Sequence, residues 1–187
     1  MSRIAVYCGA NTGNDPKYIT AARELGKWLV ANHHSLVYGG GGVGLMGILA
    51  KTVLMQDGQV TGIMPDNLYK RGAALEELED LVVVPNMATR KAEMLRMASA
   101  CIALPGGPGT LEEISEAFSW ARVGDNDAPC AFYNVNGYWD PLAEMFDKMV
   151  ANEFLTAEHR SKLLFSDDLD AIQAFFDTYT PPTLRKY

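Results

Sequence analysis

The chain has 187 residues and a formal net charge of −7, with a sequence pI near 4.9. That length suffices for one domain with a sizeable hydrophobic core. The acidic balance argues against nucleic acid or an anionic membrane as the main partner, because both are negatively charged. We therefore predict a single domain over residues 1–187 that binds neither. An anionic ligand would have to be held by local donors.

Cysteine and histidine usage indicates a reducing compartment and no metal site. Cys8, Cys101 and Cys130 are widely spaced and odd in number, which is typical of reduced thiols in the core of a cytosolic protein. No signal peptide and no apolar run of about 20 residues is evident. The three histidines form no ligand-like cluster with the cysteines. We predict a cytoplasmic protein without a bound metal.

The first half of the chain alternates short apolar runs with helical patterns. Asp15 and Pro16 are typical of a helix N-cap and first turn, so a helix is predicted to run to about Asn32. An acidic, partly helical segment is expected at residues 68–81. Buried strands are expected at residues 3–8, 35–38, 59–64 and 81–84.

A glycine-rich segment, GGGGVGLMG, follows the second predicted strand at residues 39–47. It contains G-x-G-x-x-G, but the dinucleotide fingerprint usually follows the first strand, with an acid about 20 residues on. No Gly-Lys-Ser/Thr ending is present, so this is not a Walker A loop. The segment either approaches a ligand through Gly41 and Gly42 or packs a helix tightly on the sheet. Binding of NAD or FAD is the weaker alternative.

The next helical pattern carries an arginine in an apolar stripe. Met87, Arg90, Met94, Met97 and Cys101 recur at spacings of three and four, so we expect them on one face. A buried guanidinium must be paired or bind an anion. Arg90 is therefore expected to pair with an acidic residue of the following helix or to bind an anionic ligand, and both alternatives place it in a cleft.

A glycine-proline loop, PGGPG, follows a fifth predicted strand at residues 100–104. The apolar spacing after Thr110 predicts a helix whose free amides point at the glycines, and such a terminus binds anions. Thr110 and Glu113 also fit a capping box, T-x-x-E, which needs no ligand. A capping box explains these two residues, but it does not explain three glycines where amides converge.

Beyond this loop we expect a sixth strand at residues 129–135. Helices are expected at residues 141–152, 156–164 and 169–179, with a tail at 181–187. The alternation of strands and helices predicts an α/β, Rossmann-like fold in three layers, a parallel sheet with helices on both faces. Ligands of such sheets bind outside the carboxyl ends of the strands, where both glycine loops lie.

The segments PGGPGTLEE and MATRKAEM resemble the LOG family of nucleotide phosphoribohydrolases, long mislabelled as lysine decarboxylases. The signatures of that family are PGGxGTxxE and a preceding HxRK. The resemblance spans nearly the whole chain. It implies a homodimeric enzyme, without a cofactor, that hydrolyses the N-glycosidic bond of purine or cytokinin nucleoside 5'-monophosphates such as AMP.

By this resemblance the family's catalytic arginine and glutamate correspond to Arg90 and Glu113. Two positions depart from the family pattern, Ala88 in place of the histidine of HxRK and Gly72 in place of an upstream glutamate, and they leave the preferred base open. The expected substrate-binding set is Gly41, Gly42, Met87, Lys91, Gly106, Gly107, Pro108, Gly109, Thr110, Leu111, Glu112 and Ser119.

These residues suggest a mechanism. The phosphate would lie on the amides at the helix start, and cleavage of the glycosidic bond would build positive charge on the ribose. Glu113, expected in the first helical turn, would be kept ionised by the helix dipole and Arg90, and would stabilise that charge or activate water. Arg90 would position the sugar. Lys91 lies off the stripe, so we expect it to contact phosphate or solvent.

Two other functions fit parts of the pattern. Carriers of the molybdenum cofactor, a pterin with a phosphate, resemble this fold, and in a carrier Glu113 could be only a cap. A decarboxylase would need pyridoxal phosphate on a lysine, and Lys91 beside an arginine stripe is a poor candidate. The dimer is expected on the two central helices, because they carry more apolar surface than one sheet face needs, at Met94, Met97, Phe118 and Trp120.

Overall fold

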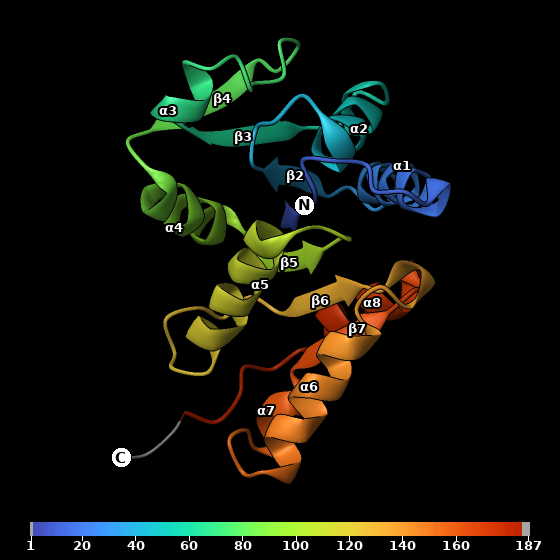
Figure 1. Cartoon of the computed structure of the whole chain (residues 1–187), viewed down its shortest axis with the longest axis vertical. Helices are drawn as coiled ribbons and strands as arrows, with labels where there is room; N and C mark the ends of the chain where they lie inside the picture. The colour runs from blue at the N-terminus through green and yellow to red at the C-terminus, as the bar shows by residue number, and fades with distance from the viewer. Residues whose placement is uncertain (1, 185–187) are drawn as a thin grey trace.

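A computed structural model describes residues 2–184 of the chain. Its centre is a parallel sheet of seven strands in the order β4-β3-β2-β1-β5-β6-β7 (Figure 1). Each strand is short and mostly apolar, as expected for strands covered on both faces. The strands are β1 Arg3–Tyr7, β2 Ser35–Tyr38, β3 Val60–Pro65, β4 Asp80–Val84, β5 Ala100–Ala103, β6 Cys130–Tyr133 and β7 Leu163–Ser166.

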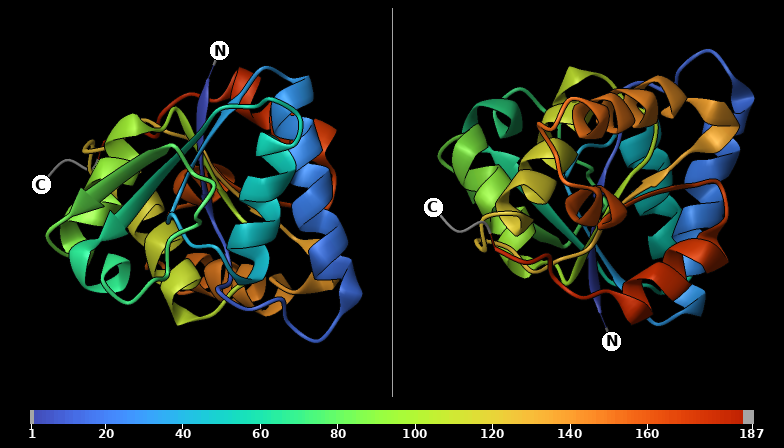
Figure 2. Two further views of the ribbon diagram at one scale, coloured as in Figure 1. Left: turned by 90° about the horizontal axis from the view of Figure 1, so that it is seen from above. Right: turned by 90° about the horizontal axis from the view of Figure 1, so that it is seen from below.

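Helices cover both faces of the sheet, which gives the predicted three layers (Figure 2). Side chains alternate along β1, so Ile4 and Val6 pack in one core with α1 and α2, whereas Ala5 and Tyr7 pack in the other with α4 and α5. The helices are α1 Pro16–Ala31, α2 Gly44–Leu54, α3 Asp66–Tyr69, α4 Met87–Met97, α5 Pro108–Ala121, α6 Asp140–Ala151, α7 Ala157–Ser161 and α8 Leu169–Thr178.

The order of the strands reverses between β1 and β5. The chain runs outward from β1 through β2 and β3 to β4, then returns to β5 on the other side of β1. Crevices at such switch points are where doubly wound sheets bind ligands. The backbone amide of Gly9, just after β1, donates to the carbonyl of Pro105, just after β5, at 3.1 Å. This bond joins the two loops at the switch point.

Most predicted elements are confirmed, including the helix that begins after Asp15, whose side chain accepts a hydrogen bond from the Lys17 amide. The helix expected at residues 156–164 is wrong in its second half, because the run from Leu163 to Ser166 pairs with β6 as a seventh strand. The segment expected at residues 68–81 is helical only in α3. The last three residues of the expected tail lie outside the described residues.

The apolar stripe of α4 is shorter than predicted, because the helix ends at Met97 and Cys101 lies in β5. Met94 and Phe118, expected at a dimer interface, are instead buried in the core between the sheet and α4 and α5. No described helix is both long enough and apolar enough to cross a membrane. Between residues 2 and 184, no group of three or more metal-binding side chains is placed to hold an ion.

Candidate active site

A cavity of about 490 Å³ opens at the carboxyl ends of the central strands. It lies at the switch point and is enclosed by the loop after β1, the start of α2, the first turn of α4, the loop between β5 and α5, and the turn after β6. Its lining residues are Cys8, Gly9, Ala10, Asn11, Thr12, Gly13, Tyr18, Leu45, Met46, Met87, Arg90, Pro105, Gly106, Gly107, Gly109, Thr110, Glu112, Glu113 and Tyr138.

The loop before α5 presents free backbone amides to this cavity. The helix begins at Pro108 with Gly107 as its N-cap, and no side chain caps it. Thr110 is therefore a third helical residue, so the capping-box alternative is wrong. Its side chain is buried against Gly106, where a Cβ atom would overlap it. Uncapped amides at a helix start, with a dipole that favours negative charge, form an anion site.

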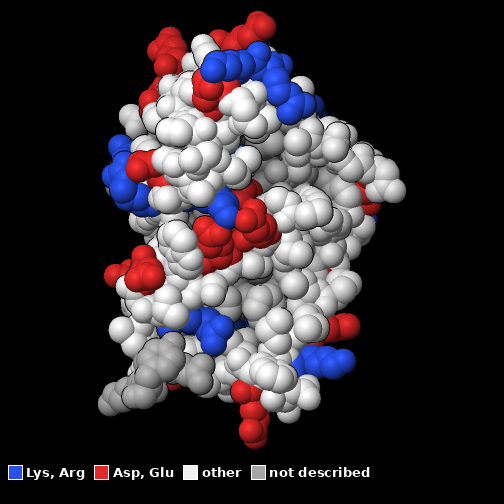
Figure 3. Space-filling model, turned by 60° about the vertical axis from the view of Figure 1, so that its left-hand side comes forward, with Lys and Arg blue, Asp and Glu red and all other residues white. Residues whose placement is uncertain are grey.

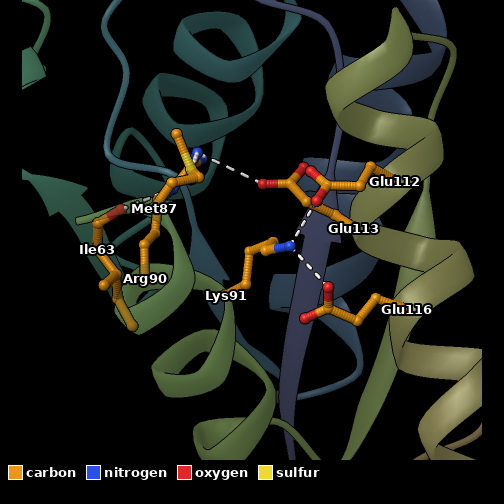
Figure 4. Close-up of polar contacts among 7 residues, drawn as sticks. All are labelled: Ile63, Met87, Arg90, Lys91, Glu112, Glu113 and Glu116. Atoms are coloured by element: carbon orange, nitrogen blue, oxygen red, sulfur yellow. Dashed lines mark hydrogen bonds and ion pairs between the residues drawn. The ribbon is translucent and has the colours of Figure 1, made fainter.

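Arg90 is buried at the opposite wall of the cavity. Its Nε donates to the carbonyl of Ile63 on β3 at 3.1 Å, and its Nη1 lies 3.1 Å from the sulfur of Met87 (Figure 4). The guanidinium also lies against Gly39, where a Cβ atom would overlap Nη2. Glycine at position 39 thus leaves the space that the guanidinium occupies. The glycine segment at residues 39–47 therefore contributes to the site by packing against Arg90.

Glu113 pairs with Arg90 in the lining of the cavity. Arg90 Nη1 and Glu113 Oε1 are 3.4 Å apart, and each side chain is only 10% exposed. Burial raises the pKa of Glu113 above its usual value, and the nearby Arg90 opposes this shift only in part. Because α5 begins at Pro108, Glu113 lies in the second turn. The expected first-turn position is therefore wrong, and burial opposes the ionisation that was expected from the helix dipole and Arg90.

Lys91 points away from the cavity. Its Nζ lies 2.5 Å from Glu112 Oε1 and 2.6 Å from Glu116 Oε2, and these bonds raise its pKa. Two carboxylates therefore hold this amine on the face of α4 and α5, and the expected contact with phosphate stays a prediction. On the face formed by α4 and α5, acidic side chains gather around a basic one (Figure 3).

Leu45 and Met46 at the start of α2 and two other parts of the cavity were missed by sequence reasoning. One is the loop after β1, residues 9–13, whose turn-rich sequence GANTGNDP and position after a strand were the available signal. The other is Tyr138, whose hydroxyl donates to the carbonyl of Gly106 at 2.6 Å and whose ring packs edge-on against Tyr18. No sequence motif indicated the role of Tyr138, because its contact joins segments far apart in the chain.

The structure brings about half of the predicted binding set to the cavity. Met87, Gly106, Gly107, Gly109, Thr110 and Glu112 line it, together with Arg90 and Glu113. Six predicted binding residues, and the two residues that differ from the family pattern, do not line the cavity. These are Gly41, Gly42, Lys91, Pro108, Leu111 and Ser119, with Gly72 and Ala88, both exposed. Their roles in substrate binding stay predictions.

The segment around Gly41 and Gly42 packs a helix rather than reaching the cavity. The amides of Leu45 and Met46 at the start of α2 donate to the Gly9 carbonyl at 3.0 and 3.4 Å. A Cβ atom on Gly47 would overlap the backbone of Gly42, so the glycine allows close helix packing. The packing alternative is favoured, and the amides at this terminus are occupied within the protein.

A parallel sheet with a glycine loop and a helix start at its switch point is the architecture of nucleotide-binding α/β proteins. Residues 46–175 match the family model described as "Possible lysine decarboxylase". The chain is 41% identical over 180 residues to a rice (Oryza sativa subsp. japonica) protein named "Probable cytokinin riboside 5'-monophosphate phosphoribohydrolase", covering 96% of this chain and 81% of that protein. The chain belongs to this family, the LOG family.

A second relative, from Arabidopsis thaliana, is named "Cytokinin riboside 5'-monophosphate phosphoribohydrolase" and is 38% identical over 181 residues, covering 97% of this chain and 85% of the relative. Among solved structures, the molybdenum cofactor carrier protein from Chlamydomonas reinhardtii superposes with a TM-score of 0.72 at 17% identity. That match covers 95% of this chain and 99% of the carrier. At such identity the likeness shows the shared fold alone.

Proposed function

We propose that the protein hydrolyses the N-glycosidic bond of purine or cytokinin nucleoside 5'-monophosphates, releasing the free base and ribose 5-phosphate. The observation that carries this proposal is the buried pair of Arg90 and Glu113, which faces a cavity whose other wall is an uncapped helix start. One wall suits a phosphate, and the carboxylate suits a sugar that gains positive charge. The names of the relatives support the same reaction.

In the proposed reaction the phosphate lies on the amides of Gly107, Gly109 and Thr110. Arg90 holds the ribose or phosphate and fixes the sugar against Glu113. As the bond from C1' to the base breaks, its electron pair leaves with the base and C1' becomes cationic. The Glu113 carboxylate stabilises that cation and accepts a proton from the attacking water, whose oxygen bonds to C1'. The departing base takes up one proton from solvent and Glu113 returns its proton to solvent, so the free base is neutral and the carboxylate is restored.

The test is release of free base from a panel of nucleoside monophosphates, measured by chromatography, with ribose 5-phosphate as the second product. AMP and N6-modified AMP are the expected substrates. The unphosphorylated nucleosides should react far more slowly, because the loop amides contribute binding energy only to a phosphate. Absence of base release from every nucleotide would refute the proposal. The panel also identifies the preferred base, which Ala88 and Gly72 leave open.

The carrier alternative has weaker support. It rests on structures below 25% identity that show the fold alone, whereas the relatives at 38–41% identity carry the names of hydrolases. A carrier would bind a phosphate-bearing ligand in the same cavity without releasing adenine from AMP. Decarboxylation would need a free lysine for pyridoxal phosphate, and the amine of Lys91 is held by two carboxylates.

We also propose that the chain acts as a single domain, in the cytoplasm, as a homodimer. Three buried, unbridged cysteines suit a reducing compartment. For the dimer, support comes from exposed apolar side chains on neighbouring elements, Val82 and Val83 on the edge strand β4, Met87 on α4 and Leu111 on α5. Light scattering at micromolar concentration should give twice the 20.5 kDa chain mass. A monomer would contradict the dimer.

A further inference from the structure

Two ion-pair sets link α4 to α5 side by side. Arg90, Glu113 and Glu112 line the cavity, whereas Lys91 and Glu116 do not. Arg90 and Glu113 point into it, while the next residue along α4, Lys91, pairs with Glu112 and Glu116. The Lys91 side chain is 14% exposed and does not line the cavity. Figure 4 shows its amine between the two carboxylates, beside the Arg90–Glu113 pair.

We propose that Lys91 is a positioning residue that clamps α4 to α5 and shields Glu113 from the negative charge of Glu112 and Glu116. This inference rests on the proposed function and deepens it, because it assigns how the catalytic carboxylate keeps its reactive charge. Lys91 acts through the other carboxylates and touches no substrate atom.

The charges around Glu113 explain why such a shield is needed. Its own helix supplies two further carboxylates and α4 supplies two cations, so the cluster holds three carboxylates, Glu113 included, and two cations. Burial raises the pKa values of the neighbouring Tyr7 and Cys8 on the sheet side, so both are neutral near pH 7. The titratable and charged groups that face Glu113 are Arg90, Lys91, Glu112, Glu116, Tyr7 and Cys8.

Removal of Lys91 would leave Arg90 as the one neighbouring cation among these groups. Burial already raises the pKa of Glu113, Arg90 and Lys91 lower it, and Glu112 and Glu116 raise it. In a site shielded from water, each neighbouring charge acts more strongly than on the surface. Without Lys91, both partner carboxylates would favour protonation of Glu113, and the protonated acid can neither stabilise a cation nor accept a proton.

The alternative role for Lys91 is direct contact with the phosphate. That role would use the remaining N–H of an amine that two carboxylates hold at 2.5 and 2.6 Å, on a side chain that does not line the cavity. The two roles predict different kinetics. A phosphate ligand contributes to nucleotide binding and to the preference for nucleotide over nucleoside, whereas a shield changes the pH at which Glu113 ionises and leaves that preference unchanged.

The experiment measures kcat/KM for AMP from pH 4.5 to 9 in the full-length protein. Lys91→Met should move the acid limb, where activity falls as Glu113 gains a proton, upward by about one pH unit. Its KM for AMP at the optimum should stay within about twofold, and the ratio of AMP to adenosine hydrolysis should not change. Lys91→Arg restores the cation and should return the limb to its wild-type position.

The triple variant Lys91→Met, Glu112→Gln, Glu116→Gln removes one positive and two negative charges. Its acid limb should lie at or below the wild-type value, which a general loss of packing would not produce. Two results would overturn the proposal. One is an unshifted limb in Lys91→Met, and the other is a tenfold rise in KM for AMP together with loss of the preference for AMP over adenosine.

A readout without catalysis separates this inference from the proposed function. Carbon-13 NMR titration of labelled glutamate carboxyls, with Glu113→Gln to assign the signal, follows the ionisation of Glu113 directly. Lys91→Met should raise that midpoint by the same amount as the acid limb. If the wild-type protein released no base, the proposed reaction would fail, while an unchanged midpoint would refute the shield.

Discussion

The guanidinium of Arg90 occupies the space where a side chain at Gly39 would begin. We expect Gly39→Ala to displace Arg90 from Glu113 and to lower base release from AMP about as much as Arg90→Ala does, since either change removes the positioned cation. The double variant should be no worse than Arg90→Ala alone, because both act on one interaction. Additive losses in the double variant would contradict this relationship.

Glu113→Gln should lower kcat for AMP by about 100-fold or more, the scale for losing one electrostatic stabiliser. The amide keeps the size of the side chain and removes its charge. Glu93→Gln is the matched control, because Glu93 lies on α4 and pairs only with Arg96 among the described residues. Glu112 would be a poor control, since it lines the cavity and holds Lys91. A folded Glu113→Gln protein with normal kcat would refute the assigned role.

The pH dependence of activity follows from the raised pKa of Glu113. The reaction needs the carboxylate, so activity should fall as the pH drops through a midpoint above the usual glutamate value of about 4.5. Steady-state rates between pH 4.5 and 9 measure this midpoint. An acid limb at or below the usual value would show that another group controls the reaction.

The raised pKa of Glu113 also makes the stability of the folded chain depend on pH. Burial makes the folded chain hold the Glu113 proton more tightly than the unfolded chain does. The stabilising contribution is therefore fully present below the unfolded pKa and is lost as the pH rises through the folded pKa. Thermal unfolding of Glu113→Gln and wild type should show the variant gaining relative stability across that window. A constant difference in Tm would contradict the shift.

Tyr138 fixes the peptide between Gly106 and Gly107. Its hydroxyl holds the Gly106 carbonyl, and because a trans peptide is planar, the Gly107 amide points the opposite way. Tyr138→Phe should raise KM for AMP about fivefold, the effect of one hydrogen bond of about 1 kcal/mol, and leave adenosine hydrolysis unchanged. Tyr69→Phe, on the exposed surface of α3, is the control. Equal effects on both substrates would point to general loss of structure.

The sequence predicted most of the fold because the strands are short apolar runs and glycine, proline or asparagine follows them. It missed β7, because the run from Leu163 to Ser166 is too short to distinguish a strand from the end of a helix. Pairing with β6 decides the matter, and pairing is a property of the assembled sheet.

Within the site, the pairing of Arg90 with Glu113 could be predicted from sequence. The apolar stripe around Arg90 indicates a buried cation that needs an acidic partner, and the next predicted helix carries Glu113. The charge state of Glu113 could not be predicted from sequence. Burial is the largest influence on its pKa, and burial depends on every element around the cavity. The partners of Lys91 were equally hidden. They lie one and two turns along another helix, and only the packing of α4 on α5 brings them to its amine.

The hydrogen bond from the Gly9 amide to the Pro105 carbonyl limits when the site can form during synthesis of the chain. Until β5 has been synthesised, β1 is an edge strand with unpaired backbone groups, which must wait for a partner from the second half of the sequence. The cavity needs both loops, so a partly made chain contains no site. Base release thus requires a chain in which β5 has paired with β1, which keeps chains without β5 from consuming nucleotides.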